Sequence, residues 1–243
     1  MASTGSPLDQ FKLQPLVPLH LGGYDISFSN SALYMVVAVG LVTLMMTAAV
    51  SARGMVPGRF QALAEMLYSF VANMVRDNAG HDSKPYFPFV FSIFMFILLG
   101  NLLGMIPYTY TFTSQIIVTF ALAATVFLAV TIIGLLRHGL HFFSLFFPTG
   151  APKVMAPILI PIELLSYLSR PVSLSIRLFA NMMAGHTMLK VFAIFAVSLG
   201  IAGLAPLAII VALTGFEVLV AVLQAYVFSI LTCLYLRDAL ELH

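Results

Sequence analysis

Long apolar runs dominate the chain, and they predict membrane-spanning helices. Three runs, over residues 31–52, 85–107 and 113–136, have about the length that crosses a bilayer in helical form. Between them, residues 57–78 mix polar side chains with apolar positions that recur at the 3.6-residue period of a helix. We expect this segment to be an amphipathic helix on the membrane surface, and a helix packed on a soluble partner is the alternative. Residues 1–30 are more polar and contain prolines, so we expect an extramembrane lead segment.

The last third of the chain, residues 154–240, contains two longer runs, over 156–198 and 204–240. Helices of this length extend over roughly 50–60 Å, whereas the hydrocarbon core of a bilayer is about 30 Å thick. The turn between the two runs, 198–206, carries no charged residue. Helices this long must tilt steeply, break or project beyond the bilayer. Polar residues are distributed along the helix and not confined to its ends, so we predict a long, steeply tilted antiparallel helical hairpin.

Folding this hairpin about its turn brings polar residues of the two helices level with each other. The midpoint between His186 and Glu217 is 201.5, and that between Arg177 and Gln224 is 200.5. Both values fall inside the turn, so we expect each pair to lie at one height across the hairpin. His186 follows Arg177 by nine residues, which places it on roughly the opposite side of its helix.

The composition agrees with a membrane protein. Hydrophobic residues make up 61% of the chain and charged residues 8%, against about 25% charged residues in soluble domains. We therefore predict an all-α integral membrane protein with a single membrane domain, residues 1–243. The net charge of +2 gives no reason to expect a nucleic-acid partner. Basic residues near the span ends favour a cytoplasmic location for the loops that carry them.

A polar stripe runs along the first helix of the predicted hairpin. Six residues with spacings of 4, 3, 4, 4 and 3 share one side of that helix: Ser166, Arg170, Ser173, Arg177, Asn181 and Ala184. Apart from the two arginines the side chains are small or short, which favours the close passage of another surface. An arginine at membrane depth costs roughly 3 kcal/mol, so Arg177 indicates function more strongly than packing.

Titratable groups on either side of Arg177 suggest two half-paths for an ion. Glu163 precedes Arg177 by fourteen residues, about 20 Å along the helix, and lies toward the basic, cytoplasmic side. His186 and Glu217 lie toward the other side. The guanidinium cannot lose its proton, so it blocks a direct leak between the half-paths. A mobile carboxylate on a partner must carry the ion past Arg177, because this chain has no second carboxylate near the middle of the stripe.

Three segments, PVSLSIRLFANMMAGH, LLGNLLGMIP and VLVAVLQAYVF, resemble those of a known family. The chain resembles the a subunit of F-type ATP synthases, the stator half of the membrane (Fo) ion channel, over nearly its whole length from the first span onward. This resemblance implies that Arg177 is the essential stator charge that faces the rotating ring of c subunits. It also implies that Asn181 and Gln224 are the polar positions beside that charge.

The resemblance further implies two offset half-channels. Asn101, His186 and Glu217 match positions in the half-channel from the periplasmic or intermembrane side, and Glu163 matches the acidic residue of the cytoplasmic half-channel. Some members of the family carry an acidic residue three places after the position of Asn101. This chain has Gly104 there, so that role is not transferred.

The implied function is proton translocation, coupled to rotation of the ring and thereby to ATP synthesis. The implied partners are the c-ring subunits, the peripheral-stalk b subunits, the rest of the ATP synthase complex and the lipid bilayer. No active site, cofactor or metal of its own is expected. The implied location is the bacterial inner membrane or the mitochondrial inner membrane.

Other interpretations have less support from the residues. An ion-coupled secondary transporter is the main alternative, but such proteins usually show internal repeats, and this sequence shows none. A metalloenzyme is disfavoured because His138 and His141 form a weak ligand pair and the other histidines are scattered. Structural explanations also stay open for single residues: a hydrogen-bonded packing role for His186, interhelical hydrogen bonds for Asn101 and Gln224, and an ion pair between Glu163 and Arg170.

Overall fold

A computed structural model describes residues 11–18, 20–21, 24–25, 27–51, 58–106, 109–139, 141–142 and 155–240 of the chain. Most of this described part is α-helical, which confirms the predicted all-α class. The helices are α1 (Asn30–Ser51), α2 (Arg59–Ala79), α3 (Phe87–Gly104), α4 (Ile116–His138), α5 (Ala156–Ser198) and α6 (Leu204–Leu240). Short 3-10 helices lead into three of them: η2 (His81–Tyr86) into α3, η3 (Phe112–Ser114) into α4, and η6 (Gly200–Gly203) into α6.

The lead segment contains short strands that the sequence did not predict. β1 (Pro15–Val17) pairs antiparallel with β4 (Phe28–Ser29), and β2 (His20–Leu21) pairs antiparallel with β3 (Tyr24–Asp25). The backbone amide of Asn30 donates to the carbonyl oxygen of Gln14, so this small ribbon leads directly into α1. Residues 1–10 lie outside the described residues.

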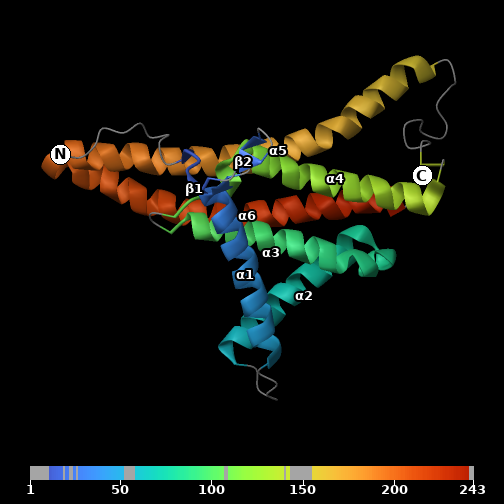
Figure 1. Cartoon of the computed structure of the whole chain (residues 1–243), viewed down its shortest axis with the longest axis horizontal. Coiled ribbons are helices and arrows are strands. Elements are labelled where there is room, and N and C mark those ends of the chain that lie inside the picture. Colours follow the sequence, from blue (N-terminus) through green and yellow to red (C-terminus); the bar gives the residue numbers. More distant parts are fainter. Residues whose placement is uncertain are drawn as a thin grey trace.

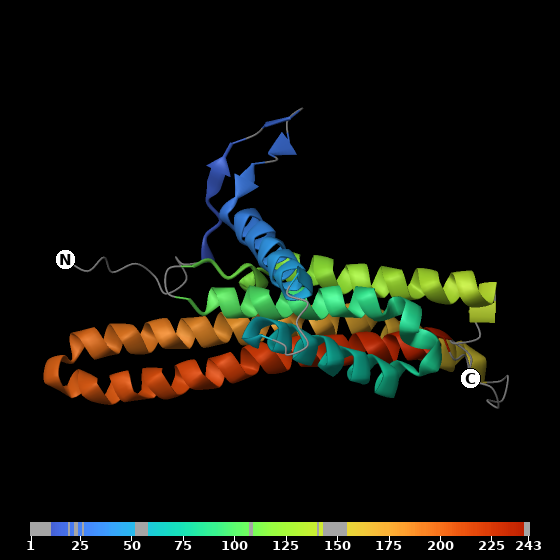
Figure 2. The same cartoon turned by 90° about the horizontal axis from the view of Figure 1, so that it is seen from below.

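Four helices, α3 to α6, lie side by side, and α1 crosses them at a large angle (Figures 1 and 2). Helix α2 packs against α1, α3 and α6. Within the described part of the chain, five helices are long and apolar enough to cross a membrane, and α2 is not one of them. The predicted spanning segments are therefore confirmed as helices, with ends that differ by a few residues. The location of α2 on the membrane surface stays a prediction.

The predicted hairpin is present as α5 and α6, which pack along each other. The 43 residues of α5 correspond to roughly 65 Å of helix and the 37 residues of α6 to roughly 55 Å. Helix α5 continues through Pro161 and Pro171, and its first part (yellow) turns away from α4 in Figure 1. Because α1 and the hairpin cross at a large angle, they cannot both lie along the membrane normal. This agrees with steep tilting, which itself stays a prediction.

Glycines close the hairpin where the chain reverses. Gly200 has a φ of +56°, a left-handed conformation that ends a helix at little cost only for glycine. At Gly203 a Cβ atom would overlap the carbonyl oxygen of Ala196, because the turn folds back onto the last part of α5. These two positions allow the tight reversal that sets α6 level with α5.

The core fixes how α5 is rotated about its axis. Leu174, Leu178 and Met182, spaced by four residues, are buried in a cluster shared with α2, α3, α4 and α6. Phe94 of α3 and Phe228 of α6 belong to the same buried cluster. With this face of α5 held against the bundle, the polar stripe turns to the outside of the chain.

Candidate ion-conducting site

Arg177 lies at the midpoint of α5, on a face that no other part of the described chain covers. Its side chain is exposed and makes no hydrogen bond or ion pair within the described residues. The other stripe residues are also exposed except Arg170, which is half-buried. The stripe predicted from spacing is therefore a surface on which a second protein can pack. Away from the stripe, Ser175 and Met182 of α5 are buried, whereas Leu168 and Val172 are exposed.

Asn181 and Gln224 join the two helices of the hairpin. The amide nitrogen Nδ2 of Asn181 donates to Oε1 of Gln224 over 2.8 Å, and Gln224 is buried. The sequence placed Gln224 level with Arg177, which precedes Asn181 by one turn of α5. The structure contains no hydrogen bond between those two residues in its described part. Gln224 bonds to Asn181 across the hairpin, and the guanidinium of Arg177 makes no hydrogen bond within the described residues.

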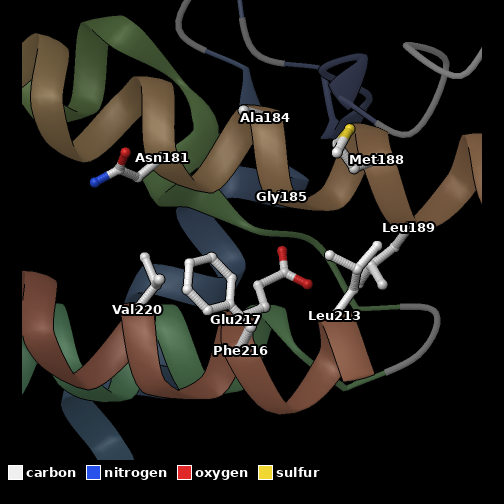
Figure 3. A pocket seen from close by; sticks show the side chains of 9 residues that line it. All are labelled: Asn181, Ala184, Gly185, Met188, Leu189, Leu213, Phe216, Glu217 and Val220. Carbon is white, nitrogen blue, oxygen red and sulfur yellow. The ribbon is translucent and has the colours of Figure 1, made fainter. Parts of the chain in front are cut away.

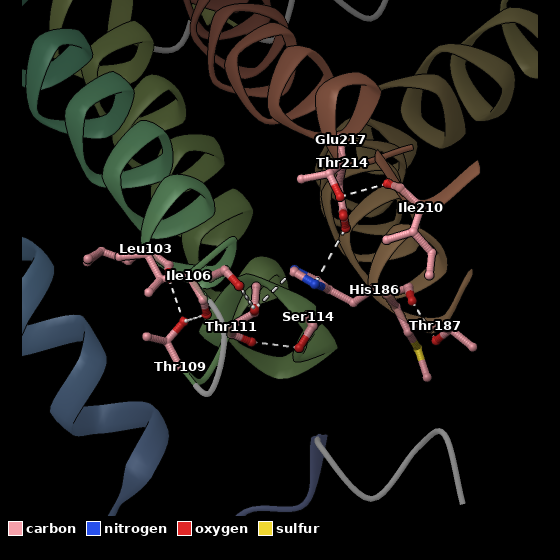
Figure 4. A network of polar contacts seen from close by, with 12 residues as sticks. Leu103, Ile106, Thr109, Thr111, Ser114, His186, Thr187, Ile210, Thr214 and Glu217 are labelled. Carbon is pink, nitrogen blue, oxygen red and sulfur yellow. Dashed lines mark hydrogen bonds and ion pairs between the residues drawn. The ribbon is translucent and has the colours of Figure 1, made fainter. Parts of the chain in front are cut away.

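His186 and Glu217 lie level across the hairpin, as the sequence predicted. Nδ1 of His186 is 3.5 Å from Oε1 of Glu217, and both side chains are largely buried. Figure 4 shows that His186 also reaches the loop before α4, where its Nε2 lies 3.2 Å from Oγ1 of Thr111. Neither carboxylate oxygen of Glu217 has a hydrogen-bond partner among the described residues. A buried carboxylate without donors is costly unless a proton or water satisfies it, so this pair suits an ion path.

The sequence did not single out Thr111. Its hydroxyl group donates to the carbonyl oxygen of Gly104 over 3.3 Å, in addition to its contact with His186. A Cβ atom at Gly104 would overlap the Thr111 side chain, so the glycine makes room for it. Only the fold brings residue 111 to residue 186, and no spacing rule links them. A threonine after an apolar span is too common a feature to have indicated the contact.

Neighbouring residues hold the Thr111 loop in place. The hydroxyl group of Ser114 donates to the Thr111 carbonyl over 2.6 Å, and the Nε2 amide of Gln115 donates to the Tyr110 hydroxyl over 2.6 Å. Both Tyr110 and Gln115 also donate to the carbonyl oxygen of Phe11, which ties the lead segment to this loop. Burial raises the pKa of Tyr110, while the Gln115 hydrogen bond lowers it in part, so the Tyr110 hydroxyl stays protonated near neutral pH.

A cavity of about 290 Å³ opens between α5 and α6 beside Glu217. Figure 3 shows the Glu217 carboxylate pointing from α6 toward α5, opposite Gly185. Asn181 and Ala184 of the stripe also line this cavity, so it connects Glu217 with the exposed face that carries Arg177. Its volume is enough for several water molecules, and the Glu217 and Asn181 side chains offer them polar partners.

Asn101 supports α6 from α3. It is fully buried, and its Nδ2 amide donates to the carbonyl oxygen of Ala221 over 3.2 Å. Ala221 lies one helical turn after Glu217, so this bond fixes the part of α6 from which the carboxylate projects. Asn101 thus makes an interhelical hydrogen bond, the structural role that the sequence analysis kept as an alternative to a place in the half-channel. They show no direct bond from Asn101 to His186 or Glu217.

Glu163, near the start of α5, is half-buried and makes no ion pair within the described residues. The alternative that it pairs with Arg170 is wrong, because Arg170 donates from Nη1 to Oδ2 of Asp238 over 3.0 Å. Asp238, at the end of α6, is a second residue that the sequence did not single out. Lys190 does not pair with Glu217, whose ion-pair partner in the described chain is His186.

The chain matches the family described as ATP synthase A chain over residues 32–237. It is 56% identical over 239 residues to the ATP synthase subunit a of Rhodospirillum rubrum, covering 98% of this chain and 99% of that protein. Identity is 55% over 245 residues with the ATP synthase subunit a of Paramagnetospirillum magneticum, covering 98% and 99% of the two chains. It is 56% over 242 residues with that of Parvibaculum lavamentivorans, covering 97% and 93%. The chain therefore belongs to the ATP synthase A chain family.

Proposed function

We propose that this chain is the stationary half of the proton channel in the membrane sector of ATP synthase, with Arg177 as its essential charge. Membership in the ATP synthase A chain family places the work of the chain within that complex and rules out the transporter alternative. The relatives are bacterial and five helices have the length and composition of spans. The chain is thus a multi-pass protein of the bacterial inner membrane.

The observation that carries the proposal is the isolated guanidinium of Arg177. It is exposed, lies halfway along a 43-residue helix, and has no hydrogen bond or ion pair within the described residues. A lone arginine among lipid tails costs roughly 3 kcal/mol or more, so an anionic group from another subunit is needed to stabilise it. A ring of c subunits carrying carboxylates supplies such a group in turn as it rotates. The small residues of the stripe, Ser173 and Ala184 among them, let that ring approach closely.

The inlet half-channel begins at Thr111 in this proposal. Because the Thr111 hydroxyl donates its hydrogen to the Gly104 carbonyl, it accepts a hydrogen bond from the Nε2–H group of His186 and so orients the imidazole. Nδ1 of His186 then faces Oε1 of Glu217 over 3.5 Å, and one further proton can reside on either group. A proton that reaches this pair can therefore be passed to the Glu217 carboxylate.

From Glu217 the cavity provides the next step. Glu217 and Asn181 line the same space, and Asn181 lies one turn beyond Arg177 on the stripe. Water in this cavity would carry the proton from Glu217 to a ring carboxylate as that carboxylate leaves Arg177. Gln224 holds Asn181 at the edge of the cavity, and Asn101 holds the Glu217 segment of α6, so we assign both a positioning role.

The outlet half-channel is assigned to Glu163, on the opposite side of Arg177. Fourteen residues of helix, about 20 Å, separate the two side chains along α5. The fixed positive charge between inlet and outlet repels a proton that would cross directly, so protons pass only on the moving ring. The resemblance also implies the peripheral-stalk b subunits as further partners of this chain.

Replacement of Arg177 by alanine in the assembled ATP synthase tests the proposal. We expect ATP synthesis driven by a proton gradient to be abolished, while the amount of complex in the membrane is unchanged, since the Arg177 side chain is exposed and makes no hydrogen bond or ion pair within the described residues. Ser173→Ala, one turn away on the same exposed stripe, is the matched control and should leave synthesis near normal. Normal synthesis with Arg177→Ala would refute the proposal.

A further inference from the structure

A second arginine lies on the outlet side of the stripe. Arg170 follows Glu163 by seven residues and precedes Arg177 by seven, so all three project from nearly the same side of α5. Seven residues are about two helical turns, or roughly 10 Å. A proton that travels from the region of Arg177 to Glu163 must therefore pass Arg170. An unpaired charge at that point would oppose its passage as Arg177 does.

The structure keeps the Arg170 charge paired and turned toward α6. Its Nη1 atom donates to Oδ2 of Asp238 over 3.0 Å, and only 22% of the Arg170 side chain is exposed. Its guanidinium carbon lies 4.9 Å from the ring centroid of Tyr235 and 5.3 Å from that of Tyr167. The Tyr167 hydroxyl is in turn hydrogen-bonded to Thr131 of α4 over 2.7 Å. Carboxylate and ring faces both attract a cation, so Arg170 is held by Asp238 and Tyr235 of α6 and by Tyr167 of its own helix.

We propose that Asp238 is a positioning residue of the outlet, which holds Arg170 against α6 so that its charge stays off the path between Arg177 and Glu163. The inference rests on the proposed function, because it needs Arg177 as the ring-facing charge and Glu163 as the outlet. Glu163 makes no ion pair within the described residues, so its carboxylate is available to protons only while Arg170 is engaged elsewhere.

Loss of Asp238 would redirect Arg170. Side chains on a helix lean toward its N-terminus, and Glu163 lies on that side of Arg170. A released guanidinium would therefore extend toward the Glu163 carboxylate and compete with the proton for it. The same movement would place a second uncompensated cation on the stripe.

Asp238→Asn in the complete ATP synthase tests this inference, because asparagine keeps the shape of the side chain and removes its charge. We expect proton flux through the membrane sector, normalised to assembled complex, to fall by about tenfold, since an opposite charge at contact distance changes the proton affinity of a carboxylate by at least about one order of magnitude. Asp238→Glu keeps the charge and should keep the flux. Asp238 is 45% exposed at the end of α6, so the substitution opens no core.

The double variant Arg170→Gln with Asp238→Asn separates this role from a purely structural one. It removes the released cation, so we expect the flux to return to within about twofold of the unmodified complex. If the ion pair only joins α5 to α6, the double variant stays as slow as Asp238→Asn, and the inference is overturned. Normal flux in Asp238→Asn overturns it equally. Neither result touches the proposed function, which depends on the separate Arg177→Ala experiment.

Discussion

Gly185 is the position where the smallest change in sequence should disturb the ion path most. It lies on α5 opposite the Glu217 carboxylate, one residue before His186. A Cβ atom at this position would lie 2.5 Å from Oε1 of Glu217, 3.0 Å from its Cδ and 3.2 Å from its Cγ. The change Gly185→Ala therefore adds one methyl group in the space that the carboxylate now fills.

The size of the disturbance follows from these distances. To restore a contact of 3.4 Å, the carboxylate must move by about 0.9 Å. The end of a glutamate side chain can rotate away, and alanine is more favourable than glycine inside a helix by about 1 kcal/mol, so we expect the complex to assemble normally. A misplacement of about 1 Å at a reacting group can cost a hundredfold in rate, so we expect proton flux to fall by about ten- to a hundredfold.

Proton flux through the membrane sector, measured in vesicles with an imposed gradient, is the assay. Gly215→Ala is the matched control: Gly215 lies on the facing helix of the same hairpin, and a Cβ atom there would meet no atom within 4 Å. Both variants gain the same methyl group and the same helix propensity. Equal flux in the two variants would show that the position of the Glu217 carboxylate does not matter, and the inlet assignment would be wrong.

Three further predictions concern the same site. Thr111→Val should slow proton flux by about tenfold or more while Thr111→Ser stays near normal, because only serine keeps the hydroxyl beside His186; equal rates would exclude a role for that hydroxyl. Exchanging the two residues, His186→Glu with Glu217→His, should preserve more flux than His186→Ala or Glu217→Ala, since the titratable pair persists; an exchange as damaging as either alanine variant would argue against shared proton transfer. Asn181→Ala should lower the stability of the complex by about 1 kcal/mol, seen as a lower thermal inactivation midpoint, because the buried Oε1 of Gln224 loses its donor; an unchanged midpoint would contradict this.

Several features of the site could be predicted because they depend on one helix or on a simple count across one turn. The apolar runs set which segments are helices, and the spacing of four, three and four residues set the stripe that carries Arg177. The pairing of His186 with Glu217 followed from the uncharged turn midway between them, since α5 and α6 reverse there. These inferences needed no knowledge of how the hairpin packs on the other helices.

The sequence by itself thus determined that the chain is a helical membrane protein. It also indicated Arg177 as the candidate for the ring-facing charge, and His186 with Glu217 as a titratable pair toward the non-cytoplasmic end of the hairpin. Only the tertiary structure decided which partner each polar group takes: Thr111 for His186, Asp238 for Arg170, and Asn181 for Gln224. The physical reason is that a shift of one residue along a helix moves a side chain by only about 1.5 Å but turns it by about 100°. Neighbours from other helices are therefore chosen by the rotation and axial position that core residues such as Leu178 impose, and no spacing along one segment contains that information.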